Sequence, residues 1–148
     1  MNIHLASTDA EIIACYPVMH ELRPHISADQ FLPRVRAQER NGYRLVFQQT
    51  PEGVVAVAGF RISENLAWGR FLYVDDLVTQ ATQRSKGHGA ALLGWLKQYA
   101  EREGCQQFHL DSGIQRKDAH RFYEHEGMNM NSLHFAVLVG ADKNKGNL

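Results

Sequence analysis

One stretch of this chain decides how it folds: Asp76-Leu-Val-Thr-Gln-Ala-Thr-Gln-Arg84-Ser-Lys-Gly87-His-Gly89-Ala90. The residues before it predict a strand that ends near Thr79, and the apolar spacing after it predicts a helix. The strand therefore passes through a basic, glycine-rich turn directly into the helix. Glycines let a backbone approach a ligand closely, and the N–H groups of a helix's first turn attract anions. With Arg84 and Lys86 beside them, these groups favour a pyrophosphate.

The turn matches neither of two common phosphate-binding patterns. It is not GxxxxGK[ST], because Lys86 precedes its glycine, and Leu92 stands where a dinucleotide fingerprint needs its third glycine. An ordinary strand-to-helix turn with solvated cations would contain the same residue types. The stretch by itself leaves both interpretations open.

The remaining segments predict an α+β order of elements. We expect a strand at 2–5, helices from Ser7 or Thr8 to near Pro24 and from Ser27 onward, and strands at 43–48, 54–60 and 71–79. A helix at 89–102, a strand at 107–110, a helix at 118–126 and a strand at 133–139 should follow. Turns at 51–53 and 64–65 imply antiparallel hairpins, whereas the strand–helix–strand run implies one parallel pair. A mixed, mostly antiparallel sheet flanked by helices is the expected architecture.

The composition favours a soluble globular protein. Of 148 residues, 44% are hydrophobic, and 16 basic residues balance 16 acidic ones. The neutral balance gives no reason to expect a nucleic-acid or membrane partner. The N-terminus lacks a signal-peptide pattern, and no apolar stretch reaches the roughly 20 residues that span a bilayer. We therefore expect a cytoplasmic protein with one domain at 1–140 and a flexible tail at 141–148.

Cysteine and histidine positions predict neither disulfides nor a metal site. Cys15 and Cys105 lie far apart in sequence and are expected to be buried free thiols. His120 and His125 are five residues apart, so they do not share a helix face as a metal-binding i, i+4 pair would. Trp68 and Trp95 are expected in the core or in a pocket wall.

Two patterns resemble signatures of the GNAT superfamily of N-acetyltransferases. Arg84-x-x-Gly87-x-Gly89 resembles the [Q/R]-x-x-G-x-[G/A] loop that binds the coenzyme A pyrophosphate in that family. The second stretch, Ala119-His-Arg-Phe122-Tyr123-Glu-His-Glu-Gly127-Met128, is similar to the signature A-x-x-[FL]-Y-E-x-x-G-[FM]. The close match covers residues 71–128, and the order of elements extends it over nearly the whole chain. The resemblance implies a GNAT-like fold with a splayed central sheet.

The resemblance also implies an acetyl-CoA site. In that family coenzyme A lies where the sheet splays open, which corresponds here to the gap between segments 76–79 and 107–112. The implied contacts are Leu77, Val78 and Thr79 for the pantetheine arm; Arg84, Ser85, Lys86, Gly87, His88, Gly89 and Ala90 for the pyrophosphate; and Ser112, Arg116, Ala119, Phe122 and Tyr123 for the far side. Arg116 replaces an Asn of many members, and could reach a cofactor phosphate or an acidic group on the acceptor.

Two catalytic roles follow from the resemblance and from the chemistry of amines. Tyr123 falls on the position of the general acid, which protonates the leaving thiolate. An alkyl amine has a pKa near that of lysine, ~10.4, so it arrives protonated and needs a base. We expect Asp76 to be that base, directly or through water, with His120 and His109 as alternatives. Because neighbours on a strand point to opposite faces, only one of Asp75 and Asp76 should face the substrate.

The expected function is transfer of an acetyl group from acetyl-CoA to a primary amine of a small molecule, by direct attack in a ternary complex. Acetylation of a protein N-terminus or lysine is a second hypothesis. A non-catalytic acyl-CoA-binding module is a third. The strand at 133–139 could pair between subunits of a homodimer.

Overall fold

The computed structural model describes residues 2–140, so the predicted tail at 141–148 lies outside the described residues. The chain divides into two compact units, Met1–Leu110 and Asp111–Leu148. One domain over residues 1–140 stays a prediction.

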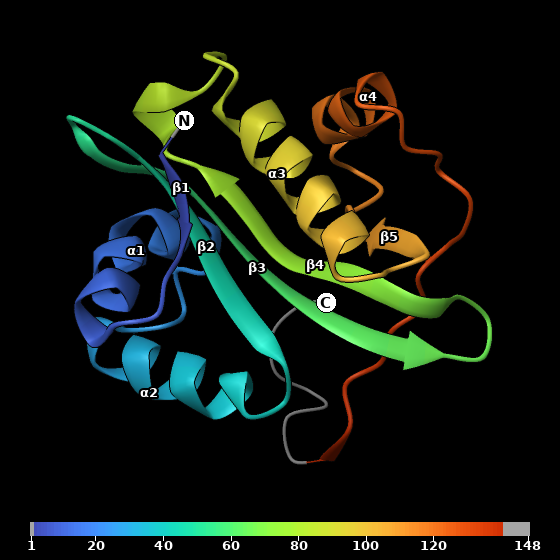
Figure 1. Cartoon of the computed structure of the whole chain (residues 1–148), viewed down its shortest axis with the longest axis horizontal. Coiled ribbons are helices and arrows are strands. Elements are labelled where there is room, and N and C mark those ends of the chain that lie inside the picture. The colour runs from blue at the N-terminus through green and yellow to red at the C-terminus, as the bar shows by residue number, and fades with distance from the viewer. Residues whose placement is uncertain (1, 141–148) are drawn as a thin grey trace. The chain divides into compact units, whose positions relative to one another are not determined.

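The first unit is built on a mixed five-stranded sheet, which confirms the α+β prediction (Figure 1). Its strands are β1 (Ile3–Leu5), β2 (Tyr43–Thr50), β3 (Gly53–Asn65), β4 (Gly69–Thr79) and β5 (Gln107–Leu110). They lie in sequence order; β1 to β4 pair antiparallel and β4 pairs with β5 in parallel. The parallel pair is the one that the strand–helix–strand pattern predicts.

Helices cover both faces of this sheet (Figure 1). The helices α1 (Asp9–Leu22) and α2 (Ala28–Glu39) pack on one face, and α3 (His88–Arg102) packs on the other. Along β2, Leu45 and Phe47 join the core with α1 and α2, whereas Val46 joins the core with α3. Side chains on both faces of β2 are therefore buried in apolar cores, which explains why Leu45, Val46 and Phe47 are three consecutive apolar residues.

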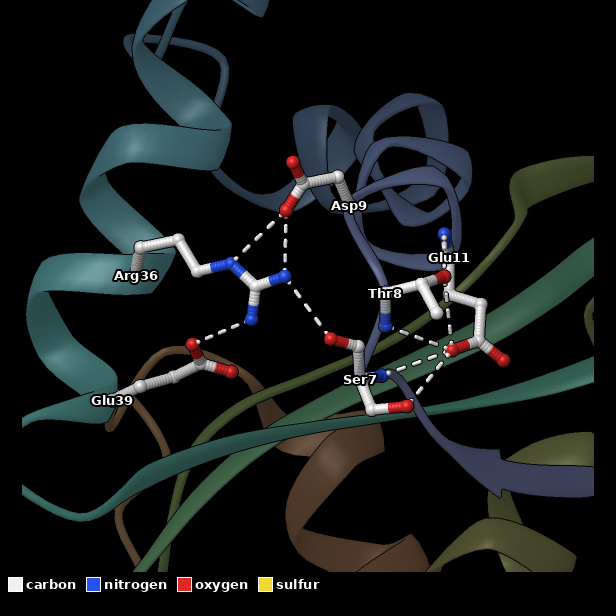
Figure 2. A network of polar contacts seen from close by, with 6 residues as sticks. All are labelled: Ser7, Thr8, Asp9, Glu11, Arg36 and Glu39. Carbon is white, nitrogen blue, oxygen red and sulfur yellow. Dashed lines mark hydrogen bonds and ion pairs between the residues drawn. The ribbon is translucent and has the colours of Figure 1, made fainter.

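The N-terminus of α1 is closed by its own side chains (Figure 2). The Glu11 amide donates to Thr8 Oγ1 at 3.1 Å, and Glu11 Oε1 accepts the Thr8 amide at 3.0 Å. This is the reciprocal capping box that a Thr followed three residues later by Glu predicts. From α2, Arg36 contacts Asp9 at 2.6 Å and so fastens the start of α1 to its neighbour.

The hairpin between β3 and β4 turns later than predicted. Pairing continues to Asn65 opposite Gly69, so the predicted turn at 64–65 is wrong by about two residues. The turn is made by Asn65 Oδ1, which accepts the Trp68 amide at 2.7 Å, and by Gly69, which adopts φ +71°. A left-handed residue of this kind is one that glycine supplies at little steric cost.

The second unit contains one helix, α4 (Lys117–His125), among its described residues. Its position matches the prediction, and Gly127 follows it with φ +89°. The predicted strand at 133–139 is wrong, because described residues 128–139 contain no strand. The side chains of Leu133, Phe135 and Val137 are 73–88% exposed. Alternation marks which side chains a strand would bury, but a strand also needs a partner backbone for its N–H and C=O groups. A homodimer stays a prediction.

Two irregularities of β4 position the candidate site. Pairing with β5 ends at Val74 opposite Leu110, and Asp76–Thr79 of β4 pair with β3 alone. On the β3 side, Val74 opposes Phe60 and Asp76 opposes Gly59, which leaves Asp75 as an extra residue. The sheet therefore opens between β4 and β5, and a β-bulge lies at the opening.

Candidate functional site

The N-terminus of α3 presents uncapped backbone donors. Gly87 occupies the cap position with φ +83° and contributes no side chain, and the first backbone bond runs from Ala91 N–H to Gly87 O at 3.0 Å. Within residues 2–140, no acceptor contacts the N–H groups of His88, Gly89 or Ala90. Three amides at the positive end of a helix dipole therefore remain available to an anion.

Two cations flank these amides. Arg84 and Lys86 are exposed, and their polar contacts are Arg84 Nε to Thr79 O at 3.5 Å and Lys86 Nζ to Gln83 Oε1 at 3.2 Å. No carboxylate pairs with either side chain among the described residues. Ser85 between them adopts φ +65°, which turns the chain tightly ahead of Gly87. The loop therefore keeps two uncompensated positive charges beside the helix terminus.

The exposed edge of β4 lies immediately before this loop. The side chain of Val78 packs in the core with α1 and α2, and that of Leu77 packs in the core with α3. Both side chains are thus used for packing, while the backbone of Leu77–Thr79 has no strand on its β5 side within the first unit. An extended ligand could add to this edge through main-chain hydrogen bonds.

A pocket of about 490 Å³ opens on the α1–α2 side of the same strand. Its walls come from the end of α1, the α1–α2 connection, α2, β2 and β4. The lining residues are Met19, Arg23, His25, Ile26, Phe31, Arg34, Val35, Gln38, Tyr43, Tyr73, Asp75 and Asp76. This volume lies in the range typical of small-molecule sites.

Both carboxylates of β4 line this pocket, so the expectation that only one would face it is wrong. Simple alternation places Asp75 on the same face as Tyr73, and the next residue would then point to the opposite face. The bulge inserts Asp75 as an unpaired residue, and Asp76 opposite Gly59 returns to that same face.

Asp76 is held by two partners far away in sequence. Arg23 Nε donates to Asp76 Oδ1 at 2.9 Å, and the Tyr43 hydroxyl donates to Asp76 Oδ2 at 2.8 Å. Burial raises the pKa of Tyr43 well above its ordinary value, and the charge of Asp76 raises it further. Both oxygens of Asp76 are therefore engaged, and its side chain is 13% exposed.

Asp75 is engaged on one side. Arg61 Nε donates to Asp75 Oδ2 at 2.8 Å, and a terminal nitrogen of Arg61 donates to Gln38 Oε1 at 2.7 Å. No hydrogen bond reaches Asp75 Oδ1 from the described residues. Burial raises the pKa of the Asp75 carboxyl, and the Arg61 hydrogen bond opposes this shift without cancelling it. Asp75 thus combines an available oxygen with a raised affinity for a proton.

Sequence reasoning missed Arg23, Tyr43 and Arg61, the partners of the two carboxylates. One signal was present: Gly59 interrupts an otherwise apolar strand, and a glycine inside a strand often marks a bulge or a close approach. A Cβ at Gly59 would collide with the Tyr43 ring, so this glycine makes room for the hydroxyl that holds Asp76. Nothing in the sequence indicated which arginines would arrive from α1 and β3.

The second unit holds the other predicted site residues. On α4, Ala119, Phe122 and Tyr123 share a face at i, i+3 and i+4. Burial raises the pKa of Tyr123, against a smaller opposite effect of Arg116, so its phenol stays protonated at neutral pH. Ser112 Oγ is buried with no hydrogen-bond partner among the described residues. Their approach to the loop at 84–90 stays a prediction.

The alternative bases have structural partners. His109 stacks on Trp68 with ring centroids 3.5 Å apart, and His120 Nε2 contacts Gly113 O at 2.7 Å. Trp95 packs against the core with α3, as predicted. No cluster of three potential metal ligands occurs within residues 2–140. In the same residues, no helix has the length and apolar character needed to cross a bilayer.

Comparison with known proteins places this geometry in a family. A sequence model described as Acetyltransferase (GNAT) family matches residues 6–128. The chain is 38% identical over 109 residues to the uncharacterized N-acetyltransferase YhdJ of Bacillus subtilis, covering 73% of this chain and 77% of that protein. It is 34% identical over 66 residues to aminoalkylphosphonate N-acetyltransferase of Salmonella typhimurium, covering 45% of this chain and 43% of that protein.

A solved structure shows the same fold at low identity. The structure of ribosomal-protein-alanine N-acetyltransferase from Brucella melitensis aligns with a TM-score of 0.79 at 16% identity, covering 94% of this chain and 99% of that chain. The family match over residues 6–128 and the Bacillus relative show that the chain is an acyltransferase and belongs to the GNAT family of acetyltransferases.

Proposed function

We propose that this protein transfers an acetyl group from acetyl-CoA to a primary amine of a small molecule, by direct attack in a ternary complex. GNAT acetyltransferases generally use acetyl-CoA, which supplies the acetyl group as an activated thioester. The observation that supports this proposal most strongly is that β4 contributes to both the pocket and the loop before α3. β4 presents two carboxylates to a pocket at its bulge and, a few residues later, leads into the uncapped N-terminus of α3.

The first unit offers a chemically suitable site for coenzyme A. The amides of His88, Gly89 and Ala90, together with Arg84 and Lys86, would hold the pyrophosphate. The pantetheine arm would pair with the backbone of Leu77–Thr79 where β5 has parted from β4. Gly87 leaves open space at the cap, since a Cβ built there meets nothing within 4 Å. From the second unit, we propose that Ser112, Arg116, Ala119 and Phe122 border the cofactor.

We propose Asp75 as the group that receives the proton of the amine, with Asp76 in a positioning role. Only a neutral amine attacks a carbonyl, so the bound ammonium must first lose a proton. The raised pKa of Asp75 and its available Oδ1 suit this task better than Asp76, whose two oxygens already accept bonds from Arg23 and Tyr43. Asp76, the base predicted from sequence, would then fix the floor of the pocket.

We propose Tyr123 as the general acid. The amine nitrogen forms a bond to the acetyl carbon as the carbon–sulfur bond breaks, and Tyr123 donates its proton to the departing sulfur. A phenol whose pKa is raised by burial holds that proton at neutral pH until the sulfur becomes basic. Two protons leave the nitrogen in all. Asp75 takes one from the bound ammonium before the attack, and the second, lost as the amide forms, balances the proton that Tyr123 gives to the sulfur.

Two observations favour a small acceptor over a protein. The pocket of about 490 Å³ is bounded by α1, α2 and the sheet, as a small-molecule site is. The relative from Salmonella is named for an aminoalkylphosphonate acceptor, which is a small amine. Acetylation of a protein N-terminus or lysine is the second hypothesis, and the Brucella structure is named for a ribosomal-protein-alanine acceptor.

The substitution Tyr123→Phe tests catalysis against mere binding. We expect kcat to fall by about 100-fold or more, as the loss of a general acid does, with the Kd of coenzyme A within about twofold of wild type. Thiol release from acetyl-CoA in the presence of amines measures the first quantity, and calorimetry measures the second. Equal turnover by both proteins would remove Tyr123 from the mechanism. No turnover by wild type with any amine or peptide, despite coenzyme A binding, would favour the non-catalytic module.

A further inference from the structure

The acceptor pocket is chemically divided between its floor and its rim. Its floor carries the carboxylates of Asp75 and Asp76, whose side chains are 24% and 13% exposed. Its rim carries His25 and Arg34, which line the pocket yet are exposed. Negative groups therefore lie deep, and a cation and an imidazole lie near solvent.

Arg23 and Arg61 form ion pairs with the carboxylates of the pocket, whereas Arg34 forms none with the described residues. Arg23 is paired with Asp76 at 2.9 Å, and Arg61 is paired with Asp75 at 2.8 Å. The Arg34 side chain has no ion pair or hydrogen bond to any residue between 2 and 140. Its guanidinium can offer two parallel donors to a carboxylate or a phosphonate. The pocket thus holds an anion-binding group that the protein does not itself neutralise.

The pocket lining also includes four apolar side chains. Met19, Ile26, Phe31 and Val35 bring methyl, thioether and ring surfaces that suit a short carbon chain. A polyamine would place its second cation against Arg34, where like charges repel. A plain alkylamine would leave the guanidinium without a partner.

We propose that the acceptor is a small zwitterion, an amine that also carries an acidic group, with its ammonium toward Asp75 and its anion on Arg34. His25, which also lines the pocket and is exposed, adds a second polar group for the anion. This inference rests on the proposed function, because it names the substrate class of the same acetyl-transfer site. The acid can be a carboxylate or a phosphonate, because the guanidinium recognises both.

Matched amines test this proposal. The panel contains β-alanine, 3-aminopropylphosphonate and aminomethylphosphonate, each beside an alkylamine of the same chain length without the acid. Thiol release gives kcat/KM for each compound, and saturation-transfer NMR reports binding without turnover. We expect kcat/KM for acidic amines to exceed that of their counterparts by about tenfold or more, as a charged hydrogen bond would give. The carboxylate and phosphonate arms identify the favoured acid.

Two arginine variants locate the effect. Arg34→Gln should lower kcat/KM for acidic amines by about tenfold more than for acid-free amines, because it removes the charge that the acid contacts. Arg40→Gln is the matched control, since Arg40 is also exposed at the end of α2 but does not line the pocket. It should leave all rates within about twofold of wild type.

The outcomes separate this inference from the proposed function. Thiol release at equal rates with acid-free amines would overturn the inference and keep acetyl transfer. Binding of acidic amines that depends on Arg34 but yields no thiol would overturn the proposed function and, with it, the role of the zwitterion as acceptor, and would leave only recognition of the acid by Arg34. The inference would also be overturned if Arg34→Gln lowered kcat/KM equally for acidic and acid-free amines. It would be overturned as well if no acidic amine bound or gave thiol release.

Discussion

The N-termini of α1 and α3 both present backbone N–H groups, but these groups are hydrogen-bonded at α1 and free of acceptors within residues 2–140 at α3. At α1, Thr8 and Glu11 satisfy the amides reciprocally, and Arg36 ties the turn to α2 (Figure 2). At α3, Gly87 brings no side chain, and the first amides have no acceptor in the part of the chain that the structure describes. A helix start needed only for stability is closed, whereas one left open is available to a ligand.

The charged side chains near the two helix N-termini also differ in sign. Glu11 at α1 has its pKa lowered to about 2 by hydrogen bonds from the Thr8 and Ser7 backbone. Since the folded pKa lies below the ordinary 4.5, this cap stabilises the fold above that pH and loses its effect as the pH falls toward 2. At α3, the nearby charges are the cations Arg84 and Lys86 instead. One terminus carries its own anion, and the other attracts an external one.

The substitution Gly87→Asp should have the largest effect, because it gives the N-terminus of α3 an anion of its own. A carboxylate there would occupy the amides and repel a diphosphate, and we expect coenzyme A affinity to fall roughly 100-fold. Gly87→Asn is the matched control, because it imposes nearly the same shape and left-handed strain without charge. Calorimetry with coenzyme A measures both. Equal Kd values for the two variants would show that the charge at this terminus is irrelevant.

A smaller effect should come from Arg84→Ala. This side chain is exposed, so its interaction with a phosphate is screened, and we expect a loss of about fivefold in coenzyme A affinity. The dependence of Kd on salt concentration should also become shallower. Arg84→Lys keeps the charge and should recover most of the affinity. An Arg84→Ala protein that binds as tightly as wild type at low salt would remove this residue from the site.

The smallest effect on binding should come from Thr8→Ala, which opens the closed terminus. Loss of this cap should reduce the free energy of unfolding by about 1 kcal/mol, while coenzyme A affinity stays within about twofold of wild type. Urea unfolding and calorimetry give the two quantities. If Thr8→Ala weakened coenzyme A binding as much as Gly87→Asp does, the two termini would not have separate functions.

Much of the fold could be predicted because local signals agreed with tertiary packing. A cap residue at Ser7 or Thr8 predicted the start of α1, and apolar spacing predicted α3, because each of these signals lies within a short segment of the chain. The loop at 84–90 was visible for the same reason. Its glycines, cations and helix start are consecutive, so no long-range contact is needed to recognise them.

The floor of the pocket could not be predicted, because it depends on a bulge and on distant partners. Alternation placed Asp75 and Asp76 on opposite faces, and only the register of β4 against Gly59 corrects this. Arg23 reaches Asp76 across 53 positions of sequence, a pairing that no local pattern encodes. The segment 133–139 failed for a related reason, since alternation cannot supply the partner strand that an extended segment requires.

The most direct test of whether the N-terminus of α3 binds coenzyme A is to follow the backbone amides of ¹⁵N-labelled protein by NMR during titration with coenzyme A. We predict saturable shifts at the amides of residues 85–90, largest at His88, Gly89 and Ala90, with the amides of residues 9–11 of α1 unmoved. Saturable binding that leaves residues 85–90 unshifted, or no binding at all, would contradict the account.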